Sequence, residues 1–300
     1  MNMCIVIGKY FEDVGWVGFK NRDRNYLPEI SFKKVKKGNL EILYFWDDIT
    51  QYCEGMNSAG IGVLSASLMV SDDEKEITNR SKSPSKDGIK IKKALTYGDV
   101  KAVAMSLIDQ KLTGNTLVFN KDHMFLLEGT WRPGEYKAKG YEYVIKEIKK
   151  EETVCRTNHG IWIEWAGYQY NPENTNETTS RISSESRLKI AEYVAANAES
   201  PIDVLDDLSK NYTNNGQLNA IRTTLKKKMM RTTSQIMIIP SEGTMFIRPV
   251  QSHMAFNFWD LNSPDQKLWL EILSNRVLYK NLHQVGDDVS PFNTKLYHNN

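Results

Sequence analysis

The first part of the chain alternates between apolar and polar positions in the way that antiparallel strands do. Residues 4–10 are apolar and β-branched, an acidic pair at 12–13 provides a turn, and residues 15–19 return as a second strand. The pattern predicts a β-hairpin. A hairpin brings the end of its second strand back beside the start of its first, so polar residues that follow this second strand are expected near Cys4.

Seven more strands are predicted from similar alternation and from short apolar runs bounded by turn residues. They are expected at residues 40–46, 61–68, 115–120, 124–128, 141–148, 235–239 and 244–248. Residues 71–88 are charged and Ser-rich and contain Pro84, so they are predicted to form an exposed loop.

Apolar residues at three- and four-residue steps indicate helices between these strands. Helices are expected at residues 89–95, 100–108 and 183–197, and from Pro201 onwards. Asp99 is the predicted cap between the first two, and Ser183 or Ser184 is the predicted N-cap of the third. Strands grouped between pairs of helices do not suit alternating βαβ units. They favour an α+β architecture of antiparallel sheets with helices packed outside.

Composition indicates a globular protein and narrows the classes of partner. The 39 Lys and Arg residues against 37 Asp and Glu give a net charge of +2, with 25% charged and 40% hydrophobic residues. These values exclude disordered, collagen-like and coiled-coil classes, and the near-neutral balance argues against a nucleic-acid partner. The basic runs at 33–37 and 226–228 are interpreted as solvated turns or helix faces.

No segment resembles a membrane helix or a secretory signal, so we expect a cytoplasmic protein with no membrane partner. Its three cysteines are Cys4, Cys53 and Cys155. They are too few and too scattered for a disulfide framework, and none has zinc-site spacing. The five histidines include no pair at metal-ligand spacing. The sequence therefore predicts neither a metal nor another cofactor. No linker rich in Pro or Gly divides the chain, which predicts a single domain over residues 1–300.

Cys4 is the first candidate for a catalytic residue. If the residues before it were removed, its thiol would lie beside a free α-amine with a reference pKa of ~7.7–8.0, suited to act as general base. Nucleophile and base would then come from one residue. Either translation begins at Met3 and that methionine is trimmed, or the Met3–Cys4 bond is cut. The alternative is a buried strand cysteine that acts as a small hydrophobe.

Three further segments carry polar residues that could assist Cys4. Asp23 could orient the amine, and Lys20 or Arg22 could favour the thiolate, although a charged turn after a strand is common. Asn158 could donate its amide to an oxyanion, or could be a turn residue. An inward-facing Arg187 at the start of a helix would need an anionic partner. His159, in the same segment as Asn158, is also a candidate for the site. The alternative is a core or surface histidine whose hydrogen bonds are satisfied by its neighbours and which has no role in the reaction.

The order and spacing of these motifs resemble the N-terminal-nucleophile hydrolases. The markers are Cys4, Asn21 with Asp23, the Gly-Met-Asn-Ser-Ala-Gly run at 55–60, the Arg-Thr-Asn-His-Gly run at 156–160, and the segment from Ser184 to Arg187. The most similar branch is that of the linear-amide hydrolases, which includes choloylglycine hydrolase and the acyl-coenzyme A:6-aminopenicillanate acyltransferase group. Residues 166–169 and 233–248 also resemble later parts of that group, so the resemblance covers residues 4–248.

The resemblance implies a four-layer αββα sandwich and a set of roles. Cys4 would attack an amide carbonyl while its own amine shuttles the proton. Asp23 would hold that amine, Asn158 would supply an oxyanion donor, and Arg187 would order the site. The further candidates for substrate or oxyanion contacts are Lys20, Asn21, Ser67 and His159.

Two positions depart from the bile-salt type of this group, which carries Arg where this chain has Lys20 and an Asn donor where it has Ser67. Both the oxyanion hole and a bile-salt substrate are therefore in question. Residues 261–300 are reached by no motif and are treated as a C-terminal extension of unknown role.

The sequence thus predicts a cysteine amidohydrolase that cleaves a linear, non-peptide C–N bond through an acyl-enzyme on Cys4. One alternative keeps this site but transfers the acyl group to an amine, which makes an acyltransferase. Another is an unprocessed, inactive relative that serves as a binding or structural protein. The expected partner is a small-molecule amide, with a homo-oligomer possible, and the substrate itself is not indicated.

Overall fold

The computed structural model describes residues 2–24, 30–68, 87–132, 140–166, 180–222 and 230–249, together with two short strands near the C-terminus. A five-stranded antiparallel sheet has the order β10 (Val154–Arg156), β1 (Asn2–Phe11), β2 (Gly15–Arg24), β11 (Arg231–Ile239) and β12 (Thr244–Pro249). A seven-stranded antiparallel sheet runs in chain order through β3 (Ile30–Lys37), β4 (Leu40–Asp47), β5 (Tyr52–Asn57), β6 (Ile61–Ala66), β7 (Gly114–Phe119), β8 (Met124–Trp131) and β9 (Tyr141–Ile148). The strands β13 (Gln284–Val285) and β14 (Asp288–Val289) pair with each other.

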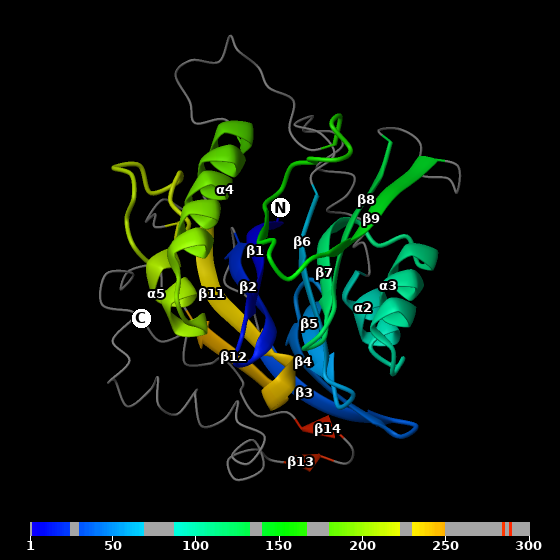
Figure 1. The fold of residues 1–300 in the computed structure, drawn as a ribbon. Helices are drawn as coiled ribbons and strands as arrows, with labels where there is room; N and C mark the ends of the chain where they lie inside the picture. Colours follow the sequence, from blue (N-terminus) through cyan, green and yellow to red (C-terminus); the bar gives the residue numbers. More distant parts are fainter. Residues whose placement is uncertain are drawn as a thin grey trace.

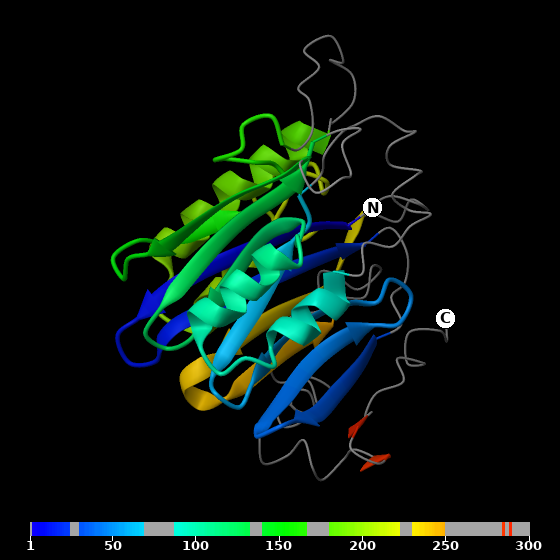
Figure 2. The ribbon, with the colours of Figure 1, turned by 90° about the vertical axis from the view of Figure 1, so that its right-hand side faces the viewer.

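Helices cover the outer face of each sheet, which produces four layers (Figure 1). The helices α4 (Ser180–Asn197) and α5 (Pro201–Leu208) lie on the five-stranded sheet, and α2 (Asp87–Ala94) and α3 (Val100–Asp109) lie on the seven-stranded sheet. Figure 2 shows α2 and α3 in front of the seven-stranded sheet. A 3-10 turn, η2 (Pro240–Glu242), joins β11 to β12. The predicted α+β sandwich of two antiparallel sheets with helices outside is therefore confirmed.

Two apolar clusters hold the layers together. The larger lies between the sheets and extends under α4 and α5, and it includes Trp16, Phe19, Leu64 and Phe119, none of which is exposed. The smaller joins α2 and α3 to the outer face of the seven-stranded sheet. Burial of this much apolar surface is the main stabilising contribution to the stack.

Most of the predicted elements are present, but β2 extends to Arg24, beyond the predicted end at residue 19, so the polar residues expected after this strand lie within it. The hairpins β1–β2, β7–β8 and β11–β12 are all present. The predicted cap Asp99 accepts a hydrogen bond from the N–H of Ala102 at 2.8 Å. At Pro201, the helix α5 is preceded by a capping box between Ser200 and Asp203.

The predicted start of α4 was wrong. The helix begins at Ser180, three residues before the expected cap, so Ser183 and Ser184 lie inside it. Both hydroxyls instead donate hydrogen bonds to residues outside the helix. Ser183 Oγ donates to the Gln217 carbonyl at 2.6 Å, and Ser184 Oγ donates to Thr157 Oγ1 at 2.9 Å. The two serines that were predicted to cap the helix therefore form tertiary contacts instead.

Two strands of the seven-stranded sheet, β3 and β5, were not predicted. The basic run at 33–37, interpreted as a turn or helix face, belongs to β3, where Val35 is buried while Lys36 and Lys37 are exposed. In the run at 55–60, the first three residues complete β5 and only the last three form the turn. The first residues of α2, Asp87 and Gly88, were expected to end the loop at 71–88.

Several predictions concern residues outside the described ranges. Residues 71–86, 167–169 and 226–228 lie outside them, as does most of 261–300. The single-domain boundary and the separate extension therefore stay predictions. Among the helices that the structure describes, none is both long and apolar enough to span a membrane.

The contact between α2 and the seven-stranded sheet requires a residue without a side chain. A Cβ added at Gly88 would lie 2.1 Å from the carbonyl oxygen of Gln51 and 2.7 Å from the amide nitrogen of Cys53. Both are backbone atoms, which cannot move aside as a flexible side chain can. Cys53 Sγ also donates to the Gly88 carbonyl at 3.0 Å.

We expect Gly88→Ala to lower the free energy of unfolding by roughly 1–3 kcal/mol, because α2 must move away from the sheet to admit the methyl group. Urea denaturation measures the change. Gly98→Ala is the matched control, since a Cβ there meets nothing within 4 Å. Equal stability of the two variants would contradict the close contact.

Candidate active site

Cys4 lies near the start of β1 and is almost completely buried, with 1% of its surface exposed. In the β1–β2 ladder it is directly opposite Arg22, and opposite residues of a ladder project to the same face of a sheet. Side chains at alternate positions of β2 share that face as well. Arg24 donates from Nη1 to Cys4 Sγ at 3.6 Å. The sulfur therefore faces the space between the sheets.

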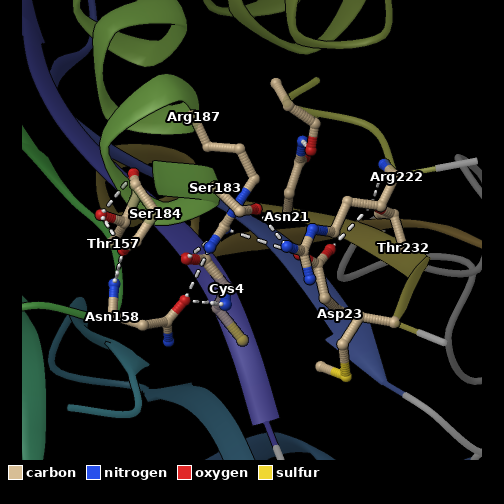
Figure 3. Close-up of polar contacts among 12 residues, drawn as sticks. Cys4, Asn21, Asp23, Thr157, Asn158, Ser183, Ser184, Arg187, Arg222 and Thr232 are labelled. Atoms are coloured by element: carbon tan, nitrogen blue, oxygen red, sulfur yellow. Dashed lines mark hydrogen bonds and ion pairs between the residues drawn. The ribbon is translucent and has the colours of Figure 1, made fainter. Parts of the chain in front are cut away.

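The backbone atoms of Cys4 are bound by two side chains, one from the loop after β10 and one from α4 (Figure 3). Its nitrogen donates to Asn158 Oδ1 at 2.9 Å, and its carbonyl oxygen accepts from Arg187 Nη1 at 3.1 Å. Arg187 Nη2 also donates to Asn158 Oδ1 at 3.1 Å. These three residues form a closed set of contacts around the nitrogen that would become the α-amine.

Asn158 is held from three directions. Its backbone N–H donates to Ser184 Oγ of α4 at 3.1 Å, and its Nδ2 donates to the carbonyl oxygen of Ser67 at 2.7 Å. The side-chain oxygen is thus directed at Cys4, and the amide group at the end of β6. The interpretation of Asn158 as an oxyanion donor stays a prediction, since its contact with Cys4 is made through the oxygen.

Asp23 lies on the opposite face of β2 from Arg24. Thr232 Oγ1 donates to its Oδ1 at 2.7 Å, and its Oδ2 lies 3.6 Å from Arg187 Nη1 and 3.7 Å from Arg222 Nε. Burial raises the pKa of Asp23 above its ordinary value, while the guanidinium groups of Arg187 and Arg222 oppose that rise. Arg187 links Asp23 to Cys4, and a direct hold of Asp23 on the amine stays a prediction.

A β-bulge sits beside this carboxylate. The pairing of β11 with β2 shifts by one residue between Thr232 and Ser234. The extra residue, Thr233, donates from Oγ1 to the carbonyl oxygen of Arg22 at 3.0 Å. Bulges redirect side chains near functional sites, and this one places Thr232 opposite Asp23.

The remaining candidates lie at different distances from Cys4. Lys20 Nζ forms an ion pair with Glu54 and donates to the Ser65 carbonyl at 2.6 Å, in the layer between the sheets. Asn21 donates from Nδ2 to the Ala220 carbonyl at 2.9 Å, on the helix side. Ser67 enters the site through its backbone carbonyl. His159 contacts Ser184 Oγ at 2.8 Å through Nδ1 and thereby supports the Asn158 segment.

Three residues that contribute to the site were not predicted in these roles. Arg24, rather than Lys20 or Arg22, contacts the sulfur, and the period of two along β2 places it on the correct face. Thr232 and Arg222 bind Asp23. They lie about 200 residues away along the chain, so no local pattern could have revealed them. Within the described ranges, no group of three His, Cys, Asp or Glu side chains is placed to hold a metal.

The His159 environment gives a pH dependence with a definite sign. Burial lowers the pKa of His159 to about 4, below its ordinary value of 6.5. The unfolded chain takes up this proton near pH 6.5 and the folded protein only near pH 4. Stability that is fully present above pH 6.5 is therefore lost as the pH falls toward 4.

We expect the wild-type protein to lose roughly 2–3 kcal/mol more of its free energy of unfolding between pH 6.5 and 4 than His159→Gln does. Urea denaturation at a series of pH values measures the difference between the two proteins. Parallel pH profiles would show that His159 is not held neutral by the fold.

Comparison with known proteins finds similar solved structures but no similar sequence. No family model and no curated protein match the sequence. Penicillin V acylase from Agrobacterium tumefaciens is similar in structure, with a TM-score of 0.46 and 12% identity, over 82% of this chain and 83% of that chain. A mutant conjugated bile acid hydrolase from Clostridium perfringens has a TM-score of 0.43 and 10% identity, over 82% of this chain and 89% of that chain. An acylase and a hydrolase are thus among the solved structures similar to this chain, and at these identities neither activity transfers to it.

Proposed function

We propose that this protein is an amidohydrolase that cleaves a linear, non-peptide C–N bond through an acyl-enzyme on Cys4. The observation that carries the proposal is the pair of contacts on one residue, with Asn158 Oδ1 at the Cys4 nitrogen and Arg24 Nη1 at its sulfur. A thiol and an amine fixed side by side are what an N-terminal nucleophile requires.

The other two cysteines are poor candidates for a nucleophile. Burial raises the pKa of both Cys53 and Cys155 far above the ordinary value for a thiol. Cys53 also uses its S–H to bind the Gly88 carbonyl. Neither has a guanidinium donor on its sulfur among the contacts of the described residues, whereas Cys4 does.

The proposed reaction begins with hydrolysis of the Met3–Cys4 peptide bond, which leaves an α-amine on Cys4. In the acylation step Cys4 Sγ forms a bond to the amide carbonyl carbon, and the α-amine takes the thiol proton. The C–N bond then breaks and the same proton passes to the leaving amine. Water, deprotonated by the α-amine, hydrolyses the thioester and restores the thiol.

The surrounding residues support this cycle by fixing the amine. Asn158 Oδ1 accepts one N–H of the Cys4 nitrogen at 2.9 Å, which orients the nitrogen lone pair toward the other side. Arg187 Nη1 binds the Cys4 carbonyl at 3.1 Å and prevents rotation of that peptide unit. Asp23 balances the charge of Arg187 from the helix side at 3.6 Å. Such preorganisation contributes to catalysis because no reorientation is needed during the reaction.

Processing is the first condition for this chemistry. We expect the purified protein to have an intact mass that corresponds to a chain beginning at Cys4, with cysteine as its first residue by N-terminal sequencing. An active protein in which residues precede Cys4 would contradict the role of the amine. A wholly uncleaved and inactive protein would favour the binding or structural alternative.

The nucleophile itself is tested by substitution. We expect Cys4→Ala to lower kcat by ~10³-fold or more on simple acyl amides, since it removes the sulfur on which the proposed thioester forms. Cys155→Ala is the matched control, because it removes a buried thiol from the neighbouring strand β10. Circular dichroism checks that both variants fold. Full activity of Cys4→Ala would refute the proposal, and products that carry an added amine would indicate acyl transfer.

A further inference from the structure

The side chain of Asn115 binds the backbone on both sides of Asn158. Asn115 is the second residue of β7 and is fully buried. Its Nδ2 donates to the carbonyl oxygen of Thr157 at 2.9 Å and to that of His159 at 3.2 Å. An amide nitrogen has two hydrogens, so these contacts use both of them. The Oδ1 atom has no hydrogen-bond partner among the described residues, so Asn115 serves here as a donor.

These contacts bear directly on the direction of the Asn158 side chain. The Thr157 carbonyl belongs to the same peptide unit as the Asn158 N–H, which donates to Ser184 Oγ at 3.1 Å. Both polar atoms of this peptide unit are thus bound, the carbonyl from β7 and the N–H from α4. The Asn158 side chain leaves the backbone directly after this unit. The position of its Oδ1, which accepts from the Cys4 nitrogen at 2.9 Å, therefore depends on both contacts.

A second residue of the same sheet holds the next part of this segment. Glu128 of β8 is directly opposite Asn115 in the β7–β8 ladder and is also fully buried. Its carboxylate accepts from the three consecutive N–H groups of residues 161–163, at 2.7 to 3.1 Å. Arg156 Nε lies 3.9 Å from Glu128 Oε2. A buried charge needs such partners, and here they come from the chain that follows Asn158.

The segment between and beyond these two anchors closes on itself. We call residues 157–166 the Asn158 loop. The N–H of Gly160 donates to the Ala166 carbonyl at 2.7 Å, and the N–H of Ala166 donates to the Ile163 carbonyl at 2.8 Å. A Cβ added at Gly160 would lie 2.2 Å from the Ile163 carbonyl oxygen. The loop is therefore compact, and both of its anchors belong to the seven-stranded sheet.

We propose that Asn115 is a positioning residue of the active site, which acts through Asn158 and is assisted by Glu128. Cys4 belongs to the five-stranded sheet and Asn115 to the seven-stranded sheet. The contacts from Asn115 through Asn158 to the Cys4 nitrogen therefore fix that nitrogen relative to both sheets. The hold of Asn115 on the Asn158 loop does not require any activity, whereas its part in the reaction rests on the proposed function.

Hydrogen exchange tests the hold on the loop without a substrate. We expect Asn115→Ala to raise the exchange rates of the amides at residues 158–163 by on the order of tenfold or more, because the two carbonyls beside Asn158 lose their donor. Should this variant not fold, Glu128→Gln replaces one acceptor oxygen and is expected to raise exchange at residues 161–163. Unchanged exchange in the folded variant would refute the inference.

Asn57→Ala is the matched control. Asn57 is buried in β5 of the same sheet, and its Nδ2 also donates to two carbonyls, those of Leu95 at 2.9 Å and Tyr97 at 2.8 Å. Its loss is expected to lower stability without affecting exchange at residues 158–163. An equal rise of exchange there in both variants would show a general loosening of the fold and would contradict a specific role of Asn115.

Turnover tests the part that Asn115 plays in the reaction. In the processed enzyme we expect Asn115→Ala to lower kcat on simple acyl amides by ~10–100-fold, as small displacements of a catalytic group do, with KM and the rate of Asn57→Ala within a few-fold of wild type. Asn115→Asp keeps the shape but places acceptor oxygens against two carbonyls, so it should lose as much. A full rate in Asn115→Asp would be incompatible with the role of the donors.

A double-mutant cycle tests whether the effect passes through Asn158. In the Asn158→Ala background we expect Asn115→Ala to lower kcat by no more than a few-fold, because the side chain that it positions is absent. The same loss in both backgrounds would exclude that route. Raised exchange with an unchanged kcat would remove Asn115 from the reaction and leave the amidohydrolase intact. If Cys4-dependent hydrolysis is absent from the wild type, the proposed function fails, and hydrogen exchange alone decides whether Asn115 holds the loop.

Discussion

The guanidinium group of Arg187 is the interaction on which the geometry of the site depends. It is fully buried and comes from α4 in the outer layer, yet it reaches the backbone of Cys4, the side chain of Asn158 and the carboxylate of Asp23. Helix, sheet and loop are therefore fixed to one another at a single point. A long side chain with several donors can do this, and no shorter residue in α4 could.

The two faces of β2 carry opposite arrangements of charge. On the helix face, Asp23 is surrounded by Arg187, Arg222 and Thr232. On the face between the sheets, Lys20, Arg22 and Arg24 form ion pairs with Asp47 of β4 and Glu54 of β5. All ten residues of β2 are buried, although the last five, from Lys20 to Arg24, are polar or charged. Such a strand is stable only because each charge has partners in the adjoining layer.

The fold could be predicted from the sequence because its elements have strong local patterns. The hairpins and the helices after Asp99 and Ser200 follow from periodicity and capping. The strand β3 could not be found in that way, since its Lys-rich sequence resembles a solvated turn and its pairing with β4 is a tertiary property. For the same reason Ser183 and Ser184 were taken for a cap, when their partners lie in distant loops.

The sequence identified most residues of the site, but it could not predict how their side chains are oriented. Cys4, Asn158 and Arg187 are in mutual contact and Asp23 adjoins them, but the sequence could not tell which atom of Asn158 faces Cys4. Nor could it tell that Arg24, and not Arg22, reaches the sulfur. Side-chain rotamers and strand twist decide which atoms meet, and neither can be read from the sequence.

The β-bulge at Thr233 has a mechanical consequence. On one side of it, residues 234–238 of β11 follow β2 in continuous register, and on the other only Arg231 and Thr232 remain paired. A bulge bends its strand and increases the local twist, so this short end of β11 takes a different direction from the rest of the strand. Arg222 then fixes that end, because the N–H of Thr232 donates to the Arg222 carbonyl at 3.1 Å and the N–H of Arg222 donates to Thr232 Oγ1 at 2.8 Å. The position of the hydroxyl that binds Asp23 is thus set by the bulge and by a distant loop rather than by the continuous ladder.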